Sequence, residues 1–513
     1  MRISRILLTF LVCSTAILTT CTRQERDAGG SVEITATELR EHVTYFASDD
    51  LEGRRIGTPG IGAAETYIAE RMSDAGLFPL PDQNDFFLDF PLQTHSFDPE
   101  TTRLTVYGES EFALTIGRDF RPFAFSGTGA FGGELIFAGY GITAPEYGYD
   151  DYADIDVEGK IVLILRHEPE VGEAGQRFLG RRYTKHAFFV EKAKNAADHG
   201  AIAMLLVTDP LFRTTPEDLR LLERFSFPGD EISELDRSRI PALHISQESA
   251  KRILGLDAPS FDELQRRVDS GESIQIDLPT GGIQINGEVA IGESPTLVDV
   301  RNVAGYIEGV EDHWLLLGAH HDHIGRFEGS GDTIYNGADD NASGTALLLE
   351  LAEYYGLSAS RPRWNIVFVT FSAEEVGLFG SRALPRSDWL PIDRISMMLN
   401  FDMIGRNPFE PLIIFGDGFV KGAAGVIEQV AESIELAVEL QGRDHEPMSD
   451  HHIFYEQKIP FLMFHSDLHD DYHQISDHHA LLDYDRMEKI GDLTTALVDR
   501  LFSSEEAPVW VEP

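Results

Sequence analysis

The chain has 513 residues, more than a single hydrophobic core usually organises, so we expect two or three domains. Its composition, 42% hydrophobic and 25% charged, is typical of a soluble globular protein, and it has no run of about 18 apolar residues that would span a membrane. The net charge of −44 argues against nucleic-acid binding, because the phosphate backbone would be repelled.

Residues 1–21 have the pattern of an export signal. Two arginines precede an apolar stretch (6–18), and residues 18–21 are similar to the end of a bacterial lipoprotein signal, with Thr20 where a smaller residue is usual. We expect an exported bacterial protein that is periplasmic or anchored to a membrane by a lipid on Cys21. The alternative is cleavage after Ala16, which would release a soluble protein.

The cysteine content limits the kinds of site that the mature protein can form. Cys13 lies inside the signal, so processing before Cys21 leaves no pair for an internal disulfide. A protein of this size folds without disulfides. Any metal site must therefore be built from histidine and carboxylate ligands, and the polar residues 22–36 read as a tether.

The predicted elements change character along the chain. A helical pattern over 37–77 is broken at 49–60, and its second part (63–75) ends before Gly76. From about 130 to 280 short strand-like runs surround one helix (188–199), without a cluster of possible metal ligands. That block reads as an inserted, non-catalytic domain whose strands are predicted at 134–140, 160–165, 201–208 and 240–245.

From about residue 296 strands and helices alternate, which is typical of an α/β sheet covered by helices. The apolar runs are short, as buried strands are, and an acidic residue or a histidine follows each of them. The runs are 314–317, 366–371, 397–401 and 461–464.

Ligands of open α/β sheets bind outside the carboxyl ends of the strands, where these polar residues would meet. A further loop, 336–344, precedes a predicted helix at 345–355. Histidines and carboxylates together suit zinc or a similar cation. The candidates are His320, His321 and Asp322, then Glu374 and Glu375, then Asp402, and the segment from His465 to His479.

Each candidate also has a simpler interpretation. A single polar residue after a strand is most often a cap, and Glu374-Glu375 could be acids at a helix N-terminus. Residues 339–350 satisfy the spacing of a calcium-binding EF-hand loop, but a turn-like stretch precedes them where that motif needs a helix. The joint occurrence of all these elements favours one site.

The order of the motifs resembles the M28 family of di-zinc aminopeptidases. The resemblance covers about 37–500 and also includes Leu51-Glu52-Gly53-Arg54 and Gly57-Thr58-Pro59-Gly60. The motifs are Gly318-Ala319-His320-x-Asp322, Gly337-Ala338-Asp339-Asp340-Asn341-x-Ser343-Gly344, Ser372-Ala373-Glu374-Glu375-x-Gly377, Asn400-Phe401-Asp402-Met403-x-Gly405 and Tyr472-His473.

This resemblance implies a three-layer α/β/α metallopeptidase domain with a mostly parallel sheet, formed by residues 37–129 and 282–505. It also implies that residues 130–281 are an inserted, β-rich protease-associated domain. Peptides would be the substrates.

The resemblance further implies a role for each site residue. His320 and Asp402 would bind one zinc ion, Glu375 and His473 a second, and Asp340 would bridge both. Asp322 would orient His320, Glu374 would be the general base, and Tyr472 would help to stabilise the oxyanion. We interpret the other histidines nearby as pocket lining or surface: His321, His323, His451, His452, His465, His469, His478 and His479.

The expected function is hydrolysis of peptide bonds at the N-terminus of peptides by water that two zinc ions activate. Other reactions on the same fold remain alternatives: carboxypeptidase, dipeptidase or glutaminyl cyclase. A catalytically inactive receptor or binding protein is a further alternative, but every ligand position and the base carry suitable residues.

Overall fold

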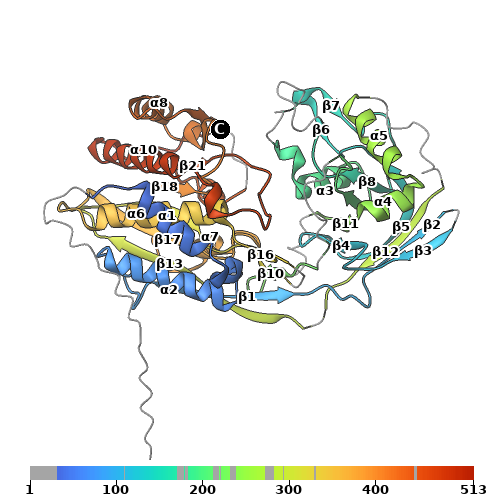
Figure 1. Ribbon diagram of the computed structural model, residues 1–513, viewed down its shortest axis with the longest axis horizontal. Helices are drawn as coiled ribbons and strands as arrows, with labels where there is room; N and C mark the ends of the chain where they lie inside the picture. The colour runs from blue at the N-terminus through green and yellow to red at the C-terminus, as the bar shows by residue number, and fades with distance from the viewer. Residues whose placement is uncertain are drawn as a thin grey trace, which may run out of the picture.

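The computed structural model describes residues 32–108, 110–169, 178, 183–211, 219, 221–230, 238–271, 282–292, 294–327, 331–443 and 448–512. The predicted export signal, with Cys21, lies outside these ranges. Within them the chain forms two lobes, each built around its own sheet (Figure 1). No helix of the described ranges is both long enough and apolar enough to cross a membrane.

The first lobe contains a nine-stranded mixed sheet. Its central strands β17, β14, β18 and β21 are parallel, whereas β10, β1 and β13 pair antiparallel at one side and β19 pairs antiparallel with β21. In sheet order the strands are β10 (Arg224–Ser226), β1 (Phe87–His95), β13 (Thr296–Ile307), β17 (Trp364–Phe371), β14 (Glu311–His320), β18 (Ile395–Phe401), β21 (Phe461–His465), β19 (Leu412–Phe415) and β20 (Val438–Leu440).

Helices cover both faces of this sheet, because successive side chains of the buried strands point to opposite sides. Leu315 and Leu317 of β14 pack under one helical layer, and Leu316 packs on the other side with α9 (His451–Glu456). The predicted three-layer α/β/α architecture is confirmed. The first layer consists of α1 (Ala36–Phe46), α2 (Pro59–Asp74), α6 (Gly344–Gly356), α8 (Ala423–Ser433) and α10 (Tyr484–Ser503), and α7 (Phe379–Ala383) lies beyond the end of β17.

The second lobe contains an eight-stranded sheet with its own core. In sheet order its strands are β3 (Glu111–Leu114), β2 (Arg103–Tyr107), β12 (Gln284–Val289), β5 (Gly129–Phe137), β8 (Ile161–Leu165), β9 (Ala203–Val207), β11 (Ala242–Ile245) and β4 (Phe120–Pro122). Helix α3 (Phe189–Asp198) covers one face, and α4 (Gln247–Leu254) and α5 (Ala258–Asp269) cover the other. The remaining strands form two separate two-stranded ribbons. They are β6 (Thr143–Ala144) with β7 (Tyr149–Asp150), and β15 (Gly325–Arg326) with β16 (Ile334–Tyr335).

The second lobe interrupts the first, and the chain leaves and returns along paired strands. Thr94 of β1 lies opposite Thr296 of β13, and Phe97 forms a bridge with Ile291. Because the ends lie together, a self-folding unit can be inserted there without disturbing the first sheet. We propose limits of about 97–291 for this unit in place of the expected 130–281, because β2, β3, β4 and β12 belong to its sheet.

One segment of the insertion returns to the first lobe. Strand β10 pairs with β1 through Gln93 and Ser226, and so adds an edge strand to the nine-stranded sheet. This return places residues 221–225 beside the edge at which the central strands end, between the two lobes (Figure 1).

Candidate metal centre

The central parallel strands bring three groups of predicted site residues to one edge of the sheet. His320 is the last residue of β14, Glu374 and Glu375 follow β17, and Asp402 follows β18. Parallel neighbours end at the same edge, so residues far apart in the sequence meet there. The side chains of His320 and Asp402 are buried, with 1% and 9% of their area exposed.

Asp340 lies between two histidines. It occupies the turn Ala338–Ser343 that leads into α6, and its peptide bond to Asn341 is cis. Its Oδ1 lies 3.3 Å from Nε2 of His320, and its Oδ2 lies 3.0 Å from Nε2 of His473. The two oxygens of one buried carboxylate therefore face two different imidazoles, as a bridging ligand requires.

Two groups of ligand atoms share Asp340. In the first, Nε2 of His320 lies 3.4 Å from Oδ1 of Asp402. In the second, Nε2 of His473 lies 3.2 Å from Oε2 of Glu375. The five residues predicted as metal ligands thus come together as two overlapping groups of three.

The spacing of these atoms fits tetrahedral coordination of a small cation. Ligand bonds of about 2.0–2.1 Å place the donor atoms of a tetrahedral zinc site about 3.3–3.4 Å apart. The observed separations of 3.3 and 3.4 Å in the first group, and 3.0 and 3.2 Å in the second, are close to that value. The nitrogen and oxygen donors also suit zinc.

His323 is a neighbour that sequence reasoning did not single out. Its Nδ1 lies 2.6 Å from Oε1 of Glu375 and 3.8 Å from Oδ2 of Asp340, so it forms a third buried group with those two carboxylates. His473 is closer to Asp340 and approaches the opposite oxygen of Glu375. We therefore propose that His473 is the ligand and that His323 holds the Glu375 carboxylate. The run His320-His321-Asp322-His323 was the only sequence signal for it.

Glu374 lies beside the first group but outside its closest contacts. Its Oε2 is 3.9 Å from Nε2 of His320. Burial, assisted by the neighbouring Asp402 and Glu375 and opposed by His320, raises its pKa well above the usual value. A carboxyl group with a high proton affinity next to the metal ligands is suited to accept and return a proton.

Asp322 approaches both His320 and the two glutamates. The Nδ1 of His320 lies 3.3 Å from the main-chain oxygen of Asp322, whereas the nearest carboxylate oxygen is 3.8 Å away. That carboxylate accepts hydrogen bonds from the backbone N–H groups of Glu374 at 3.1 Å and Glu375 at 3.4 Å. The Asp322 carboxylate therefore fixes the backbone of both glutamates beside His320.

The histidines and carboxylates of the second group shift one another's pKa values strongly. Burial lowers the pKa of His473, but Glu375 and Asp340 outweigh it and raise the pKa to about 10. Burial and Asp340 raise the pKa of Glu375, whereas His473 and His323 bring it down to about 2. Positive charge is therefore strongly favoured between Asp340 and Glu375.

A buried arginine joins the loops that carry these residues. Arg54 is fully buried, and its guanidinium donates to the backbone oxygens of His321, Asn336, Gly337 and Phe46. It belongs to the segment Leu51-Glu52-Gly53-Arg54 that supported the family resemblance. It ties the chain just after β14 and just before the Asp340 turn to the end of α1.

Asp477 links the His473 loop to the Asp340 turn. Its Oδ2 accepts hydrogen bonds from the backbone N–H groups of Asp339 at 2.9 Å and Asp340 at 3.3 Å. The carboxylate of Asp339 in turn accepts from the N–H of Gly405, and Glu350 pairs with His42 at 3.1 Å on another face of α6. The EF-hand alternative is therefore wrong, because its first and last ligands are committed elsewhere.

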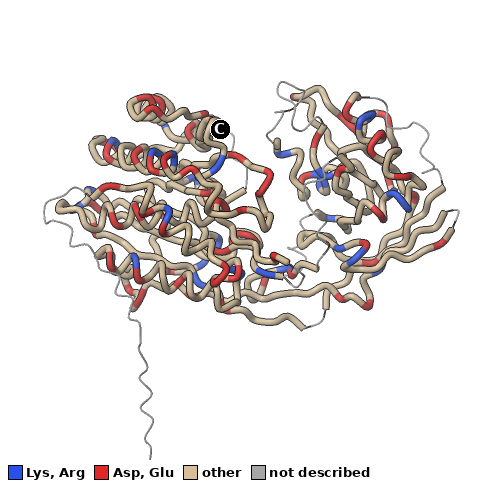
Figure 2. The backbone as a smooth tube through the Cα atoms, viewed as in Figure 1, with Lys and Arg blue, Asp and Glu red and all other residues tan. Residues whose placement is uncertain are grey.

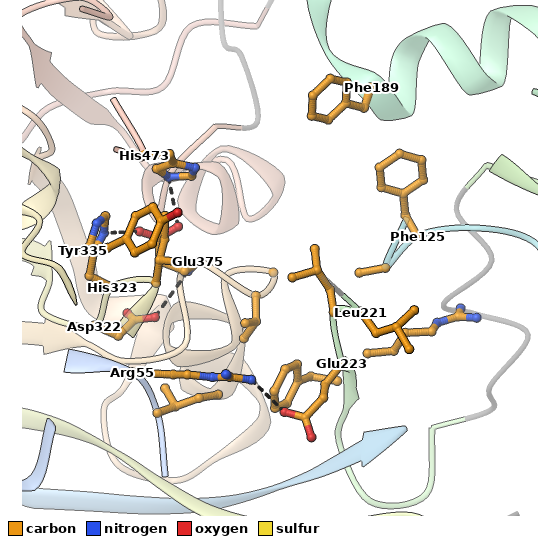
Figure 3. Close-up of a pocket in the computed structure, with 18 of the residues that line it drawn as sticks. Arg55, Phe125, Phe189, Leu221, Glu223, Asp322, His323, Tyr335, Glu375 and His473 are labelled. Atoms are coloured by element: carbon orange, nitrogen blue, oxygen red, sulfur yellow. Dashed lines mark hydrogen bonds and ion pairs between the residues drawn. The ribbon is translucent and has the colours of Figure 1, made fainter. Parts of the chain in front are cut away.

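The centre opens on one side into a cavity of about 510 Å³ between the lobes. Figure 3 shows His473, Glu375 and His323 on one side, with Phe125 and Phe189 of the second lobe facing them. The Tyr472 ring stacks on His473, with 3.9 Å between their centroids. The side chain of His473 is 36% exposed, so the second group can be reached from the cavity.

Comparison with known protein families finds one match in each lobe. Residues 302–498 match the model of peptidase family M28, and residues 131–253 match that of the PA domain. The first match contains every predicted ligand and the predicted base, and the second lies inside the second lobe.

Several curated relatives are peptidases by name. The mouse (Mus musculus) aminopeptidase NAALADL1 is 26% identical over 56% of this chain and 40% of its own length. Leucine aminopeptidase 2 of Trichophyton equinum is 26% identical over 60% and 51%, and the probable glutamate carboxypeptidase VP8 of Zea mays is 26% identical over 63% and 44%. The chain thus spans about half the length of these relatives.

Solved structures resemble the whole described chain. An aminopeptidase from Aneurinibacillus sp. strain AM-1 aligns with a TM-score of 0.55 at 22% identity, covering 93% of this chain and 95% of its own. BSAP, a zinc aminopeptidase from Bacillus subtilis, aligns with a TM-score of 0.55 at 19% identity, covering 93% and 98%. At these identities the likeness establishes the fold.

Proposed function

We propose that the protein is a metallo-aminopeptidase that removes residues from the N-terminus of peptides, since residues 302–498 match the model of peptidase family M28. The observation that carries the proposal is the pair of His/carboxylate groups that share Asp340 beside Glu374. Zinc fits both groups by donor type and spacing.

Two cations per chain are part of the proposal. His320, Asp402 and Asp340 would hold the first, and His473, Glu375 and Asp340 the second. Bound there, a pair of divalent cations supplies Lewis acidity toward water and toward the scissile carbonyl group. Three carboxylates offset most of the added charge, which the buried site needs.

Glu374 is the proposed general base. It lies too far from His320 to share its closest contacts, and its raised pKa favours uptake of a proton from water and its delivery to the leaving amine. Asp322 keeps the Glu374 backbone in place. Tyr472, stacked on His473, is the proposed donor to the developing oxyanion.

The names of the relatives favour an aminopeptidase. Leucine aminopeptidase 2 of Trichophyton equinum and the mouse aminopeptidase NAALADL1 are both similar to this chain. A carboxypeptidase is the second candidate, because the Zea mays relative carries that name and the arginines that line the cavity are suited to hold a terminal carboxylate.

Leucine p-nitroanilide and its N-acetyl derivative separate these functions. We expect the zinc-loaded protein to hydrolyse the free-amine compound and to leave the acetylated one intact. Release of the C-terminal residue from N-acetylated peptides, with no attack on free-amine anilides, would contradict the aminopeptidase proposal.

We further propose that the protein is exported and held at a membrane by a lipid on Cys21, as residues 1–21 suggest. Cys21→Ser tests this in the bacterium that makes the protein. The unaltered protein should sediment with membranes and the variant should not. Equal sedimentation of the two proteins would contradict anchoring.

A further inference from the structure

The cavity beside the metal centre is rich in arginine although the chain is strongly acidic. Lys and Arg are half as numerous as Asp and Glu in the whole sequence, 42 against 86, and acidic residues are spread over both lobes (Figure 2). The cavity lining reverses this balance, with three carboxylate residues, Asp322, Glu375 and Glu223. It contains Arg55, Arg121, Arg166, Arg224 and Arg382.

Two of these arginines lie on a wall of phenylalanines in the second lobe. The Cζ of Arg121 lies 5.3 Å from the ring centroid of Phe123, and the Cζ of Arg166 lies 5.2 Å from that of Phe189. Phe123 also packs against Phe125 and Phe189, with 5.0 Å between centroids in each pair. We call Arg121, Phe123, Phe125, Arg166 and Phe189 the arginine–phenylalanine wall.

The wall faces the metal centre across the cavity. Phe125 and Phe189 lie opposite His473 and Glu375 in Figure 3. A peptide whose scissile bond lies at the centre must extend away from it, and the wall is the opposite boundary of the available space. The wall is therefore placed to meet residues on the leaving-group side of that bond.

Arg166 has donors left for a ligand. The obvious partner, Asp209, uses one oxygen for the backbone N–H groups of Arg166 and His167 and the other for Nδ1 of His167. Within the described part of the chain, no acceptor lies within hydrogen-bonding distance of the Arg166 guanidinium. The side chain is half-buried and lines the cavity, so its charge is only partly screened by water.

Among the described residues, Arg55 lines the same cavity but, unlike Arg166, has a carboxylate partner within the protein. Its guanidinium pairs with Oε2 of Glu223 at 2.9 Å, across the junction of the lobes (Figure 3). Its charge is thereby neutralised by the protein, and the pair closes the lower edge of the cavity.

We propose that the arginine–phenylalanine wall binds a carboxylate of the peptide substrate on the leaving-group side of the scissile bond, so that acidic peptides are preferred. The inference rests on the proposed aminopeptidase function. A planar guanidinium held against an aromatic ring is already oriented, and its parallel N–H groups match the two oxygens of a carboxylate. The phenylalanine faces would accommodate the aliphatic part of the same residue.

The carboxylate could belong to a Glu side chain or to the peptide C-terminus, and three peptides distinguish these sources. They are Leu-Ala-Glu-amide, Leu-Ala-Gln-amide and Leu-Ala-Gln with a free C-terminus. We expect kcat/KM for one or both of the acidic peptides to exceed that of Leu-Ala-Gln-amide by about tenfold to a hundredfold, as for a charge-assisted hydrogen bond.

Arg166→Gln should remove this preference, and it should lower kcat/KM for the acidic peptides far more than that for leucine p-nitroanilide, since that compound has no acidic group. Arg166→Lys should restore part of the preference. Arg266→Gln is the matched control, because Arg266 lies on α5, is 54% exposed and pairs with Glu263 away from the cavity. Equal kcat/KM for the acidic and neutral peptides in the unaltered protein would overturn the inference, and so would a preference that survives in Arg166→Gln.

A binding measurement distinguishes failure of this inference from failure of the proposed function. Calorimetry on the metal-loaded Glu374→Gln protein should show tighter binding of the acidic peptides, and the additional Arg166→Gln change should abolish the difference. Discrimination in binding without cleavage of any free-amine substrate by the unaltered protein would support the wall and contradict the aminopeptidase. Cleavage of leucine p-nitroanilide without discrimination would contradict the wall alone.

Discussion

The protein buries two clusters of charged side chains, one in each lobe, and they are satisfied in opposite ways. At the metal centre, Asp340, Glu375 and Asp402 face two histidines and one another. In the second lobe, the fully buried Lys192 lies among three acidic residues, Asp151, Glu168 and Asp209.

The second-lobe cluster is complete within the protein. Asp151 accepts from the backbone N–H groups of Tyr140 and Ile142 and from the Tyr149 hydroxyl, and Lys192 donates to the backbone oxygen of Tyr140. Burial lowers the pKa of Lys192 to about 8, and Asp209, Asp151 and Glu168 oppose that shift.

The metal centre needs charge from outside. Within the described residues, Oδ1 of Asp402 has no hydrogen-bond donor, and its nearest nitrogen is that of His320 at 3.4 Å. Buried carboxylates without enough donors or counter-charge are costly. Burial of charged side chains therefore does not by itself indicate a ligand-binding site. Buried carboxylates that lack donors or counter-charge within the protein do indicate one.

Glu374→Gln gives the largest effect that we expect. Removal of a general base should lower kcat by about 10²–10⁴-fold, while the metal content stays unchanged because Glu374 is not a ligand. Steady-state kinetics and elemental analysis measure the two quantities. Glu375→Gln is the matched comparison and should lose metal; full activity in Glu374→Gln would contradict the assignment of the base.

Lys192→Met tests whether the second-lobe cluster is purely structural. Removing one partner of a buried charged group should lower the free energy of unfolding by about 3–5 kcal/mol in urea denaturation. Metal content and hydrolysis of leucine p-nitroanilide by the folded variant should not change. Lys194→Met, on the same helix but 36% exposed, should change the free energy by no more than about 0.5 kcal/mol. A loss of bound metal in Lys192→Met would refute the separation of the two clusters.

Asp477→Asn should have the smallest effect. The asparagine keeps the one oxygen that accepts from both backbone N–H groups but loses the negative charge that strengthens these bonds. The Asp340 turn should therefore loosen, and metal affinity should fall about 10–100-fold. Competition with a fluorescent zinc chelator measures the affinity. The exposed Asp470 in the same loop provides the control, since Asp470→Asn should bind zinc normally; equal affinities in both variants would show that Asp477 does not position the turn.

Much of the first lobe could be predicted because its strands carry a local signal. The apolar runs at 314–317, 366–371, 397–401 and 461–464 all lie in β14, β17, β18 and β21, and a polar residue followed each of them. The convergence of His320, Glu375 and Asp402 then follows from parallel pairing alone.

The boundaries of the inserted unit could not be predicted from the sequence in the same way. Strands β2 (Arg103–Tyr107) and β12 (Gln284–Val289) are buried at alternate positions and lie far apart in the sequence, and nothing local indicates that they pair. The contacts of Asp322, His323 and Arg166 could not be predicted either, because they depend on which atom of a neighbour lies within reach. Such contacts are set by tertiary packing, which residue types do not encode.

The metal content of protein purified without chelator tests the central claim most directly. If Asp340 serves two ligand groups, elemental analysis should find close to two zinc-class ions per chain, and both should be lost in Asp340→Asn, which removes the shared ligand. Saturation at one equivalent, or binding of calcium alone, would contradict the account.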